Sequence, residues 1–179
     1  MCRRWDDGYT LFITTNTTQA ANPHLFKKLP YDPIKDFAPV GQLVQGTMLM
    51  VVNPALKAQS VAEFIALAKK DPGKLSFGVS SPKRSPLVPG VLTIAESGLP
   101  GYSANHWNAL YAPAKTPVPV VRRLNDLMRK AMTTDALRQF AEQNGMETHP
   151  TAPEELGAFQ LAELERWGKI IKEAGIDPE

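Results

Sequence analysis

Prolines set the scale of the structural elements in this chain. Sixteen of its 179 residues are proline, and most of them lie between segments with a regular apolar pattern. Proline fixes φ and removes a hydrogen-bond donor, so it is disfavoured inside helices and central strands. The sequence therefore predicts many short elements joined by rigid turns. The prolines at these junctions are Pro23, Pro30, Pro33, Pro54, Pro72, Pro82, Pro86, Pro89, Pro100, Pro113, Pro117 and Pro119.

The composition limits the functional class. Hydrophobic residues make up 43% of the chain and charged residues 21%, as in an ordinary globular protein. The length predicts one domain or two small lobes. A net charge of +2 is too balanced to indicate a nucleic-acid partner or an anionic membrane. A single cysteine, Cys2, excludes an intramolecular disulfide and a cysteine-based metal site. No apolar run reaches the roughly 20 residues that span a bilayer.

Short apolar segments, the first of them rich in aromatic and β-branched residues, predict five strands, and capping patterns predict the helix starts. The predicted strands are residues 8–14, buried, then 37–44, 48–52, 75–79 and 107–112. Capping boxes at Ser60, Thr93 and Thr151 predict helices that begin at the next residue, and Thr116 is expected to cap a helix with Pro117 at its first position. A shorter helix is predicted over 135–143. The last helix should bury Leu156, Phe159, Leu164, Trp167, Ile170 and Ile171.

No catalytic constellation is found. His24, His106 and His149 are far apart and show no metal-binding spacing, so each is interpreted as a loop or surface residue. There is no phosphate-binding lysine loop, no dinucleotide-binding glycine pattern and no nucleophile elbow. The residues therefore predict no cofactor, no metal and no enzymatic activity. An enzyme using the hydroxyls of residues 14–18 would need a general base, and the sequence places no histidine there.

Six consecutive polar residues, 14–19, follow the first predicted strand. Their hydroxyl and amide groups, together with exposed backbone N–H groups, suit a carboxylate or another small anion. Ligands of open α/β sheets lie at the carboxyl ends of strands, which favours the same interpretation. The alternative is a polar loop that merely caps the next helix. A similar choice arises at Ser80 and Ser81, which follow a predicted short strand and are either ligand contacts or a turn before Pro82.

Several stretches together resemble the tripartite tricarboxylate transporter substrate-binding proteins, also called Bug receptors. The matching segments are DGYTLFITTNTTQAANPHLFKKLPYDPIKDFAPV, VVNPALKAQSVAEFIALAKKDPGKL, SSPKRSPLVPGVLTIAESGLPGY, WNALYAPAKTPVPVVRRLN and WGKIIKEAGIDPE. The words LPYDP and DFAPV make the resemblance specific, and it covers nearly the whole chain from Asp7 onward.

The resemblance implies an α/β fold of the periplasmic-binding-protein kind (type II, Venus-flytrap). Such proteins trap small carboxylated solutes between two lobes and deliver them to membrane permease subunits; they are not enzymes. Residues 14–19 fall on a first-lobe segment that faces the cleft in the family, and residues 107–111 fall near the return crossing. The ligand-binding residues implied are Thr15, Asn16, Thr17, Thr18, Gln19 and Trp107.

The chain departs from the family pattern in two places. The start MCRRWD stands where the family has a signal peptide and two strands with glycine-rich loops, so the receptor is expected to be truncated there. The second place is DPGKLSFGVSSPKRSP, residues 71–86. Here the sequence that ends one family segment is followed at once by the sequence that ends a later segment, without the residues that separate the two in the family. An in-frame internal deletion is the simplest hypothesis, and it makes Ser80 and Ser81 hinge residues.

These departures predict a partial fold, mainly the first lobe plus C-terminal helices, in one remnant domain. Its segments are 1–77 from the first lobe, 78–112 returning from the missing lobe, and 113–179 at the C-terminus. We expect either a periplasmic receptor for a small carboxylate or a degenerate, binding-incompetent remnant. Without an export signal the chain would be cytoplasmic. Unpartnered strand edges and apolar helix faces also predict self-association.

Overall fold

The computed structural model describes residues 6–46, 55–58, 60–70 and 105–179. The chain divides into two compact units, the first comprising Met1–Val44, Trp107–Ala141 and Glu147–Glu179, the second Gln45–His106 and Glu142–Met146. The predicted boundary between residues 77 and 78 lies outside the described residues, as do the predicted strands 48–52 and 75–79, the predicted helix after Thr93, and Ser80 and Ser81. The segment boundaries therefore stay predictions.

A four-stranded sheet is at the centre of the first unit, with strand order β1-β3-β2-β4. The strands are β1 (Phe12–Thr15), β2 (Phe37–Gly46), β3 (His106–Pro113) and β4 (Met146–Thr148). β1 and β3 are antiparallel, with Phe12 opposite Tyr111 and Thr15 opposite Asn108. The carboxyl end of β1 thus lies beside the amino end of β3. The rule that ligands lie at the carboxyl ends of parallel strands therefore does not apply to this antiparallel pair.

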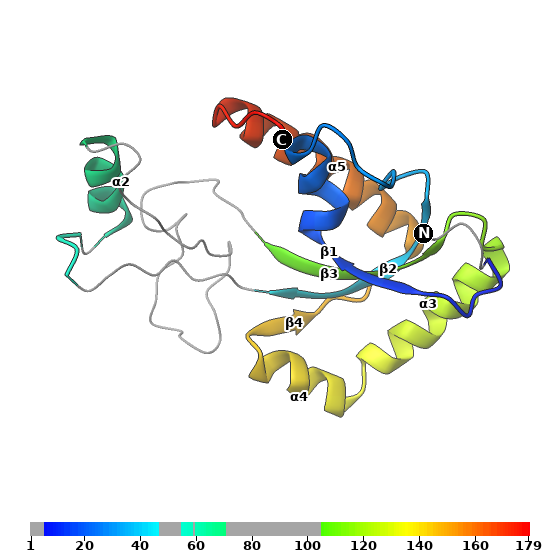
Figure 1. The fold of residues 1–179 in the computed structure, drawn as a ribbon. Coiled ribbons are helices and arrows are strands. Elements are labelled where there is room, and N and C mark those ends of the chain that lie inside the picture. The colour runs from blue at the N-terminus through cyan, green and yellow to red at the C-terminus, as the bar shows by residue number, and fades with distance from the viewer. Residues whose placement is uncertain (1–5, 47–54, 59, 71–104) are drawn as a thin grey trace. The chain divides into compact units, whose positions relative to one another are not determined.

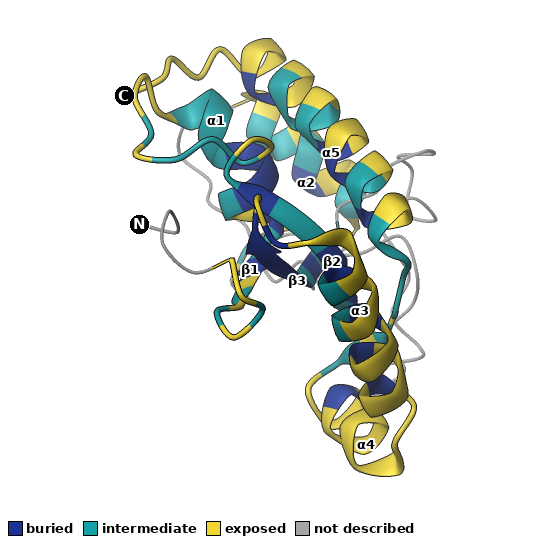
Figure 2. Ribbon diagram, turned by 90° about the vertical axis from the view of Figure 1, so that its right-hand side faces the viewer, coloured by how far each residue is buried: buried dark blue, intermediate teal, exposed yellow. Residues whose placement is uncertain are grey.

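Strand β3 is buried on both faces, and its alternating side chains separate two apolar cores. Trp107, Ala109 and Tyr111 face the first core and Leu110 and Ala112 the second. The first core is Ala20, Phe37, Trp107, Ala109, Tyr111 and Leu156; the second is Val40, Leu110, Ala112, Val121, Met128 and Met132. Figure 2 shows these buried residues concentrated in the strands and on the inner sides of α3 and α5.

Helices cover both faces of this sheet (Figure 1). The first core receives side chains from η1 (Thr17–Ala21) and α5 (Pro153–Glu173), and the second receives them from α3 (Val118–Met132). Helix α1 (Asn22–Leu25) follows η1 directly. Helix α4 (Asp135–Gln143) follows α3. In the second unit, α2 (Val61–Lys70) begins after Ser60, whose Oγ accepts the Glu63 backbone N–H at 3.2 Å. No helix in the described part of the chain is long and apolar enough to cross a membrane.

Two predicted helix caps were wrong by one residue. Helix α3 begins at Val118, so Thr116 lies outside its cap and its buried hydroxyl has no hydrogen-bond partner within the described residues. Helix α5 begins at Pro153, and its first turn is closed by Glu155, which accepts the Ala152 N–H at 2.7 Å. The Thr151 hydroxyl instead accepts the Gln42 N–H at 2.9 Å. The local pattern assigned Thr151 to helix capping, but its side chain instead binds the backbone of β2, which is distant in the sequence.

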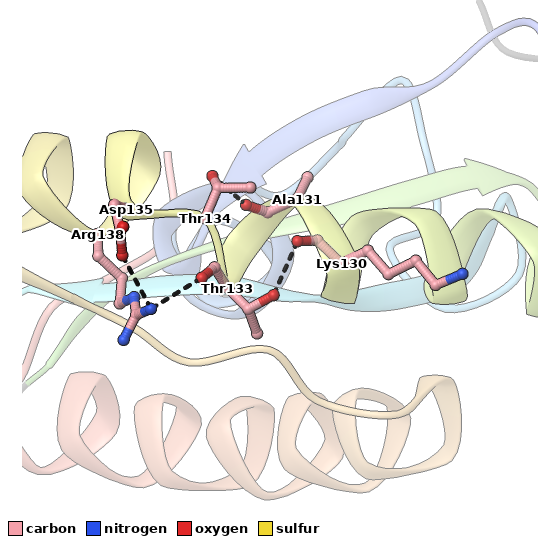
Figure 3. Close-up of polar contacts among 6 residues, drawn as sticks. All are labelled: Lys130, Ala131, Thr133, Thr134, Asp135 and Arg138. Carbon is pink, nitrogen blue, oxygen red and sulfur yellow. Dashed lines mark hydrogen bonds and ion pairs between the residues drawn. The ribbon is translucent and has the colours of Figure 1, made fainter.

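The connection between α3 and α4 is held by local polar contacts (Figure 3). The hydroxyls of Thr133 and Thr134 donate to the carbonyls of Lys130 and Ala131 at 2.8 and 2.7 Å. The Arg138 guanidinium donates to the Thr133 carbonyl and the Asp135 carboxylate at 3.0 and 3.1 Å. These bonds satisfy carbonyls that the end of α3 leaves without intrahelical donors.

The first strand is shorter and less buried than predicted. The strand begins at Phe12. Tyr9, Leu11 and Ile13 are exposed, because β1 is an edge strand of the sheet. Strand β2 continues through Gln45 and Gly46, two residues beyond the predicted end at residue 44. The predictions for β3, α2 and α4 were confirmed to within one or two residues.

Candidate functional site

The candidate residues 15–19 lie where β1 changes directly into a helix. Thr15 is the last residue of β1, and Asn16 already has helical dihedral angles of −51° and −37°. The next turn is π-helical: the Asn22 N–H donates to the Thr17 carbonyl, five residues back. Phe26, with an extended conformation, ends the helical segment. Wide turns of this kind are frequent at functional sites.

Side chains from elsewhere in the fold satisfy carbonyls of the π turn. The Tyr31 hydroxyl donates to the Thr18 carbonyl at 2.8 Å. The Gln160 amide of α5 donates to the Gln19 carbonyl at 3.3 Å and to the Pro33 carbonyl at 3.0 Å. Because a π turn disrupts the i to i−4 hydrogen-bond ladder, these donors explain how the wide turn is kept.

The other end of the helical segment is fastened to α5 and to the chain terminus. Nε2 of His24 lies 2.9 Å from the Leu164 carbonyl, and because a carbonyl only accepts, this nitrogen carries the hydrogen. The His24 ring lies over Gly168, where an added Cβ would approach the ring to 2.6 Å. The Glu179 backbone bonds the Leu25 carbonyl and the Lys27 N–H at 2.9 and 2.8 Å. His24 is therefore a packing residue at this junction.

The predicted site residues differ in accessibility. Thr17 is exposed, and Thr15 and Thr18 are half-buried. Asn16 is buried, and Gln19 is fully buried. The two polar side-chain atoms of Gln19 have no hydrogen-bond partner within the described residues. A buried amide left in this state is costly, so it requires an explanation beyond packing.

Trp107 lies at the same end of the β1–β3 pair, because Thr15 is opposite Asn108. Its side chain is fully buried, with its ring edge-on to Phe159 at 5.5 Å between centroids. Its indole N–H donates to the Glu163 carboxylate at 3.2 Å. A core role accounts for all of these contacts, and the assignment of Trp107 as a ligand residue stays a prediction.

Electrostatics at this helix start favour an anion. The chain has no charged side chain between Asp7 and His24, and the first turn of the helical segment contains no acidic residue. The first backbone N–H groups of a helix lack intrahelical acceptors and form the positive end of its dipole. A small anion at Thr15–Thr18 would therefore meet N–H and hydroxyl donors, and residues 8–23 contribute no carboxylate that would compete with it.

Sequence reasoning missed the buried polar residues of α5. Gln160 and Glu163 are 3% and 6% exposed, and the predicted buried face left both out. Glu163 bonds Trp107 and pairs with Arg166 at 2.8 Å, and Gln160 accepts the Tyr111 hydroxyl at 3.1 Å. Their spacing from Leu156 follows the buried helical stripe, which is the signal that could have identified them.

No metal centre is formed by the described residues. No cluster of three or more histidine, cysteine, aspartate or glutamate side chains occurs there. Of the three histidines, His149 is exposed, whereas His24 and His106 are half-buried in α1 and β3. The surface assignment is therefore correct for His149 and too simple for the other two.

The family model of the tripartite tricarboxylate transporter family receptor matches residues 1–83 and 76–176. The two matched parts overlap at residues 76–83, within the segment 71–86 for which an internal deletion is the hypothesis. A protein from the tcbD–tcbE intergenic region of Pseudomonas sp. strain P51 is 26% identical over 234 aligned residues, covering 93% of this chain and 69% of the relative. Because that alignment is longer than this chain, the relative contains residues that have no counterpart here.

Protein BugT of Bordetella pertussis is 22% identical, covering 94% of this chain and 72% of its own length. Among solved structures, R. palustris Rpa4515 with adipate has a TM-score of 0.85 at 24% identity, covering 99% of this chain and 82% of that one. MatC from Rhodopseudomonas palustris with bound malate has a TM-score of 0.80 at 23% identity, covering 95% and 81%. The periplasmic binding protein BugD has a TM-score of 0.83 at 20% identity, covering 99% and 82%.

At these identities the structures show a shared fold, that of periplasmic binding proteins, and the chain covers about four-fifths of each. The family model matches nearly the whole chain. The chain therefore belongs to the tripartite tricarboxylate transporter receptor family, whose members are periplasmic solute-binding receptors and not enzymes.

Proposed function

We propose that this chain is an extracytoplasmic receptor that binds a small carboxylate at the start of η1 and delivers it to the membrane permease subunits of a tripartite transporter. One observation carries the proposal. The helical segment after β1 begins with accessible threonines and has no acidic side chain in its first turn. Hydroxyl and backbone N–H donors at the positive end of a helix dipole are suited to a carboxylate.

Two further observations support a solute of this class. The buried amide of Gln19, in the first turn of the same segment, has no hydrogen-bond partner among the described residues, and a bound solute or solvent molecule would supply one. Two family structures carry the dicarboxylates adipate and malate in their names. A dicarboxylate is therefore the first solute to test.

A second candidate is a binding-incompetent remnant of such a receptor. It is favoured by the alignments, in which relatives contain residues that this chain lacks. Receptors of this kind gain affinity by enclosing the solute and excluding water. Each neutral hydrogen bond contributes only about 0.5–1.5 kcal/mol net, and ordering a ligand costs several kcal/mol. A site with one wall removed would then bind weakly or not at all.

Isothermal titration calorimetry with adipate and malate separates the two candidates. A micromolar or tighter dissociation constant, about −8 kcal/mol or better, supports the receptor and refutes the remnant. The opposite result is no heat of binding with the solute at about 1 mM, a concentration that detects binding free energies down to about −4 kcal/mol. That result supports the remnant and refutes the receptor proposal for this chain.

Thr17→Glu tests the location of the site, because its effects on stability and on binding have opposite signs. Thr17 is exposed in the first turn, so a carboxylate there should leave the melting temperature unchanged or raise it through the helix dipole. The same charge should repel the solute and weaken binding by at least about tenfold, or about 1.4 kcal/mol. Thr17→Gln is the matched neutral control and should bind within about twofold of the wild type, well under 1 kcal/mol. Unchanged affinity in Thr17→Glu would place the solute elsewhere.

A further inference from the structure

Two buried polar side chains within residues 14–19 lack hydrogen-bond partners among the described residues. They are Gln19, which is fully buried, and Thr14, which is 4% exposed. Both polar side-chain atoms of the Gln19 amide are in this state, and so is the Thr14 hydroxyl oxygen. Buried polar groups are nearly always hydrogen-bonded, and each one left without a partner is costly. Two such side chains in one short segment point to an occupant that supplies the missing bonds.

Both side chains belong to the face of the sheet that η1 covers. Thr14 is directly opposite Ala109 in β3, so the two side chains share a face, and Ala109 belongs to the first core. Ala20 of η1 belongs to the same core. A long helical side chain leans back toward the start of its helix, so the Gln19 side chain extends toward the turn that follows Thr15. The unpartnered groups are therefore directed to the end of β1, where the proposed carboxylate binds.

The Gln19 amide determines which groups this occupant must offer. Its Nε2 donates and its Oε1 accepts, so both are satisfied only by an acceptor and a donor held side by side. An ionised carboxylate only accepts, and bound to Nε2 it would leave Oε1 without a donor. A hydroxyl on the carbon next to the carboxylate supplies that donor. The Thr14 hydroxyl both donates and accepts, so it is compatible with either group.

An ammonium group on the same carbon would also supply a donor, but its charge is unfavourable here. Residues 8–23 contain no aspartate or glutamate. The buried Glu163 carboxylate already binds Trp107 and Arg166. A buried ammonium without a carboxylate partner loses hydration that no protein group replaces. A neutral hydroxyl carries no such cost, so it is the donor that this site favours.

We propose that the solute is an α-hydroxycarboxylate, whose hydroxyl donates to Oε1 of Gln19 and whose carboxylate accepts from Nε2. The inference rests on the proposed function, because it assigns the solute class of that same site. Of the two dicarboxylates named in the family structures, malate carries such a hydroxyl and adipate does not. Gln19 is then the residue that distinguishes hydroxy acids from plain carboxylates.

Calorimetry with malate, succinate and aspartate tests the proposal on the wild-type chain. These dicarboxylates have the same carbon skeleton and carry a hydroxyl, a hydrogen or an ammonium group at one carbon. We expect malate to bind at least about tenfold more tightly than either of the others, because a solute without the hydroxyl leaves a buried polar group unpaired.

Gln19→Met separates a binding role from a structural one. Methionine has nearly the same length but removes the donor and the acceptor, so the preference for malate over succinate should fall to within about twofold. Because the wild-type side chain has no partner among the described residues, the melting temperature should stay unchanged or rise. Gln143→Met, at an exposed position of α4, is the matched control and should keep the wild-type preference for malate.

The results that contradict this inference differ from the one that contradicts the proposed function. Malate and succinate binding within about twofold of each other would overturn the inference and leave the receptor function intact. A Gln19→Met variant that still prefers malate would do the same, as would aspartate binding more tightly than malate. No binding of any of the three solutes would refute the proposed function and this inference with it.

Discussion

Gln160 of α5 links the candidate site to the core, and replacing it with methionine tests that role. Methionine has nearly the same length but neither donates nor accepts strongly. The substitution removes the Gln160 bonds to the Gln19 and Pro33 carbonyls and the bond from the Tyr111 hydroxyl. Since Gln160 is 3% exposed, water cannot readily replace the lost partners.

The expected loss follows from the groups left behind. The buried Tyr111 hydroxyl loses its acceptor, and a buried group without a partner costs about 1–3 kcal/mol. The Gln19 carbonyl bond is long, at 3.3 Å, and the Pro33 bond is only partly buried at 3.0 Å, so together they add about 1–2 kcal/mol. Burial of the apolar side chain recovers about 1 kcal/mol. The free energy of unfolding should therefore fall by about 1–4 kcal/mol, a substantial share of the 5–15 kcal/mol typical of a folded protein.

Urea unfolding monitored by circular dichroism measures this change, and hydrogen exchange shows where it acts. We expect the amides of residues 17–21 to lose more protection than those of β3, because the π turn loses a donor that holds its carbonyl. Gln143→Met, at an exposed position of α4, is the control and should change stability by less than about 0.5 kcal/mol. A Gln160→Met protein within about 0.5 kcal/mol of the wild type would refute the assigned role.

Three further predictions concern single side chains. Burial raises the pKa of the Tyr111 hydroxyl above its ordinary 10.0, so folding favours the neutral phenol. The stability that this contributes is fully present below pH 10 and is lost as the pH rises further. Tyr111→Phe should make alkaline unfolding above pH 10 less steep, and an unchanged pH profile would contradict this. Gly41→Ala should destabilise the protein by about 1–3 kcal/mol in thermal unfolding, because an added Cβ would lie 2.8 Å from a backbone carbonyl oxygen. Gly157→Ala is the control: its Cβ would meet no atom closer than 3.7 Å, so this substitution should be neutral or stabilising. Gly168→Ala should displace the His24 ring and increase hydrogen exchange at the end of α1; if protection there is unaltered, the ring does not fasten this junction.

Local patterns predicted the positions of most helices and of the best strand. Residues 107–112 were predicted to form a strand, and the structure places this segment between the two cores. Helices α2 and α4 began where capping residues and apolar spacing indicated. The candidate segment 15–19 was located from its polar run, and its residues lie at the start of a helix. The sequence also identified the family, through words that extend over nearly the whole chain.

Long-range partners decided what the local patterns could not. Thr116 and Thr151 fit capping patterns equally well, but Thr151 bonds β2 and neither caps its helix. The polar side chains Gln160 and Glu163 are buried because Tyr111 and Trp107 of β3 supply partners far away in the sequence.

The exposure of β1 and the wide turn of η1 were equally beyond sequence reasoning. Strand β1 was predicted to be buried from its apolar residues, yet its exposure depends on which strand lies next to it, and only the strand order shows that it is at an edge. The π turn depends on donors from Tyr31 and Gln160 that no local propensity encodes. Local sequence determines which elements form, because propensity and capping act within a few residues. The burial of each face and the partner of each polar group are tertiary quantities, because they depend on residues beyond the local segment, as in the bond between Gln42 and Thr151.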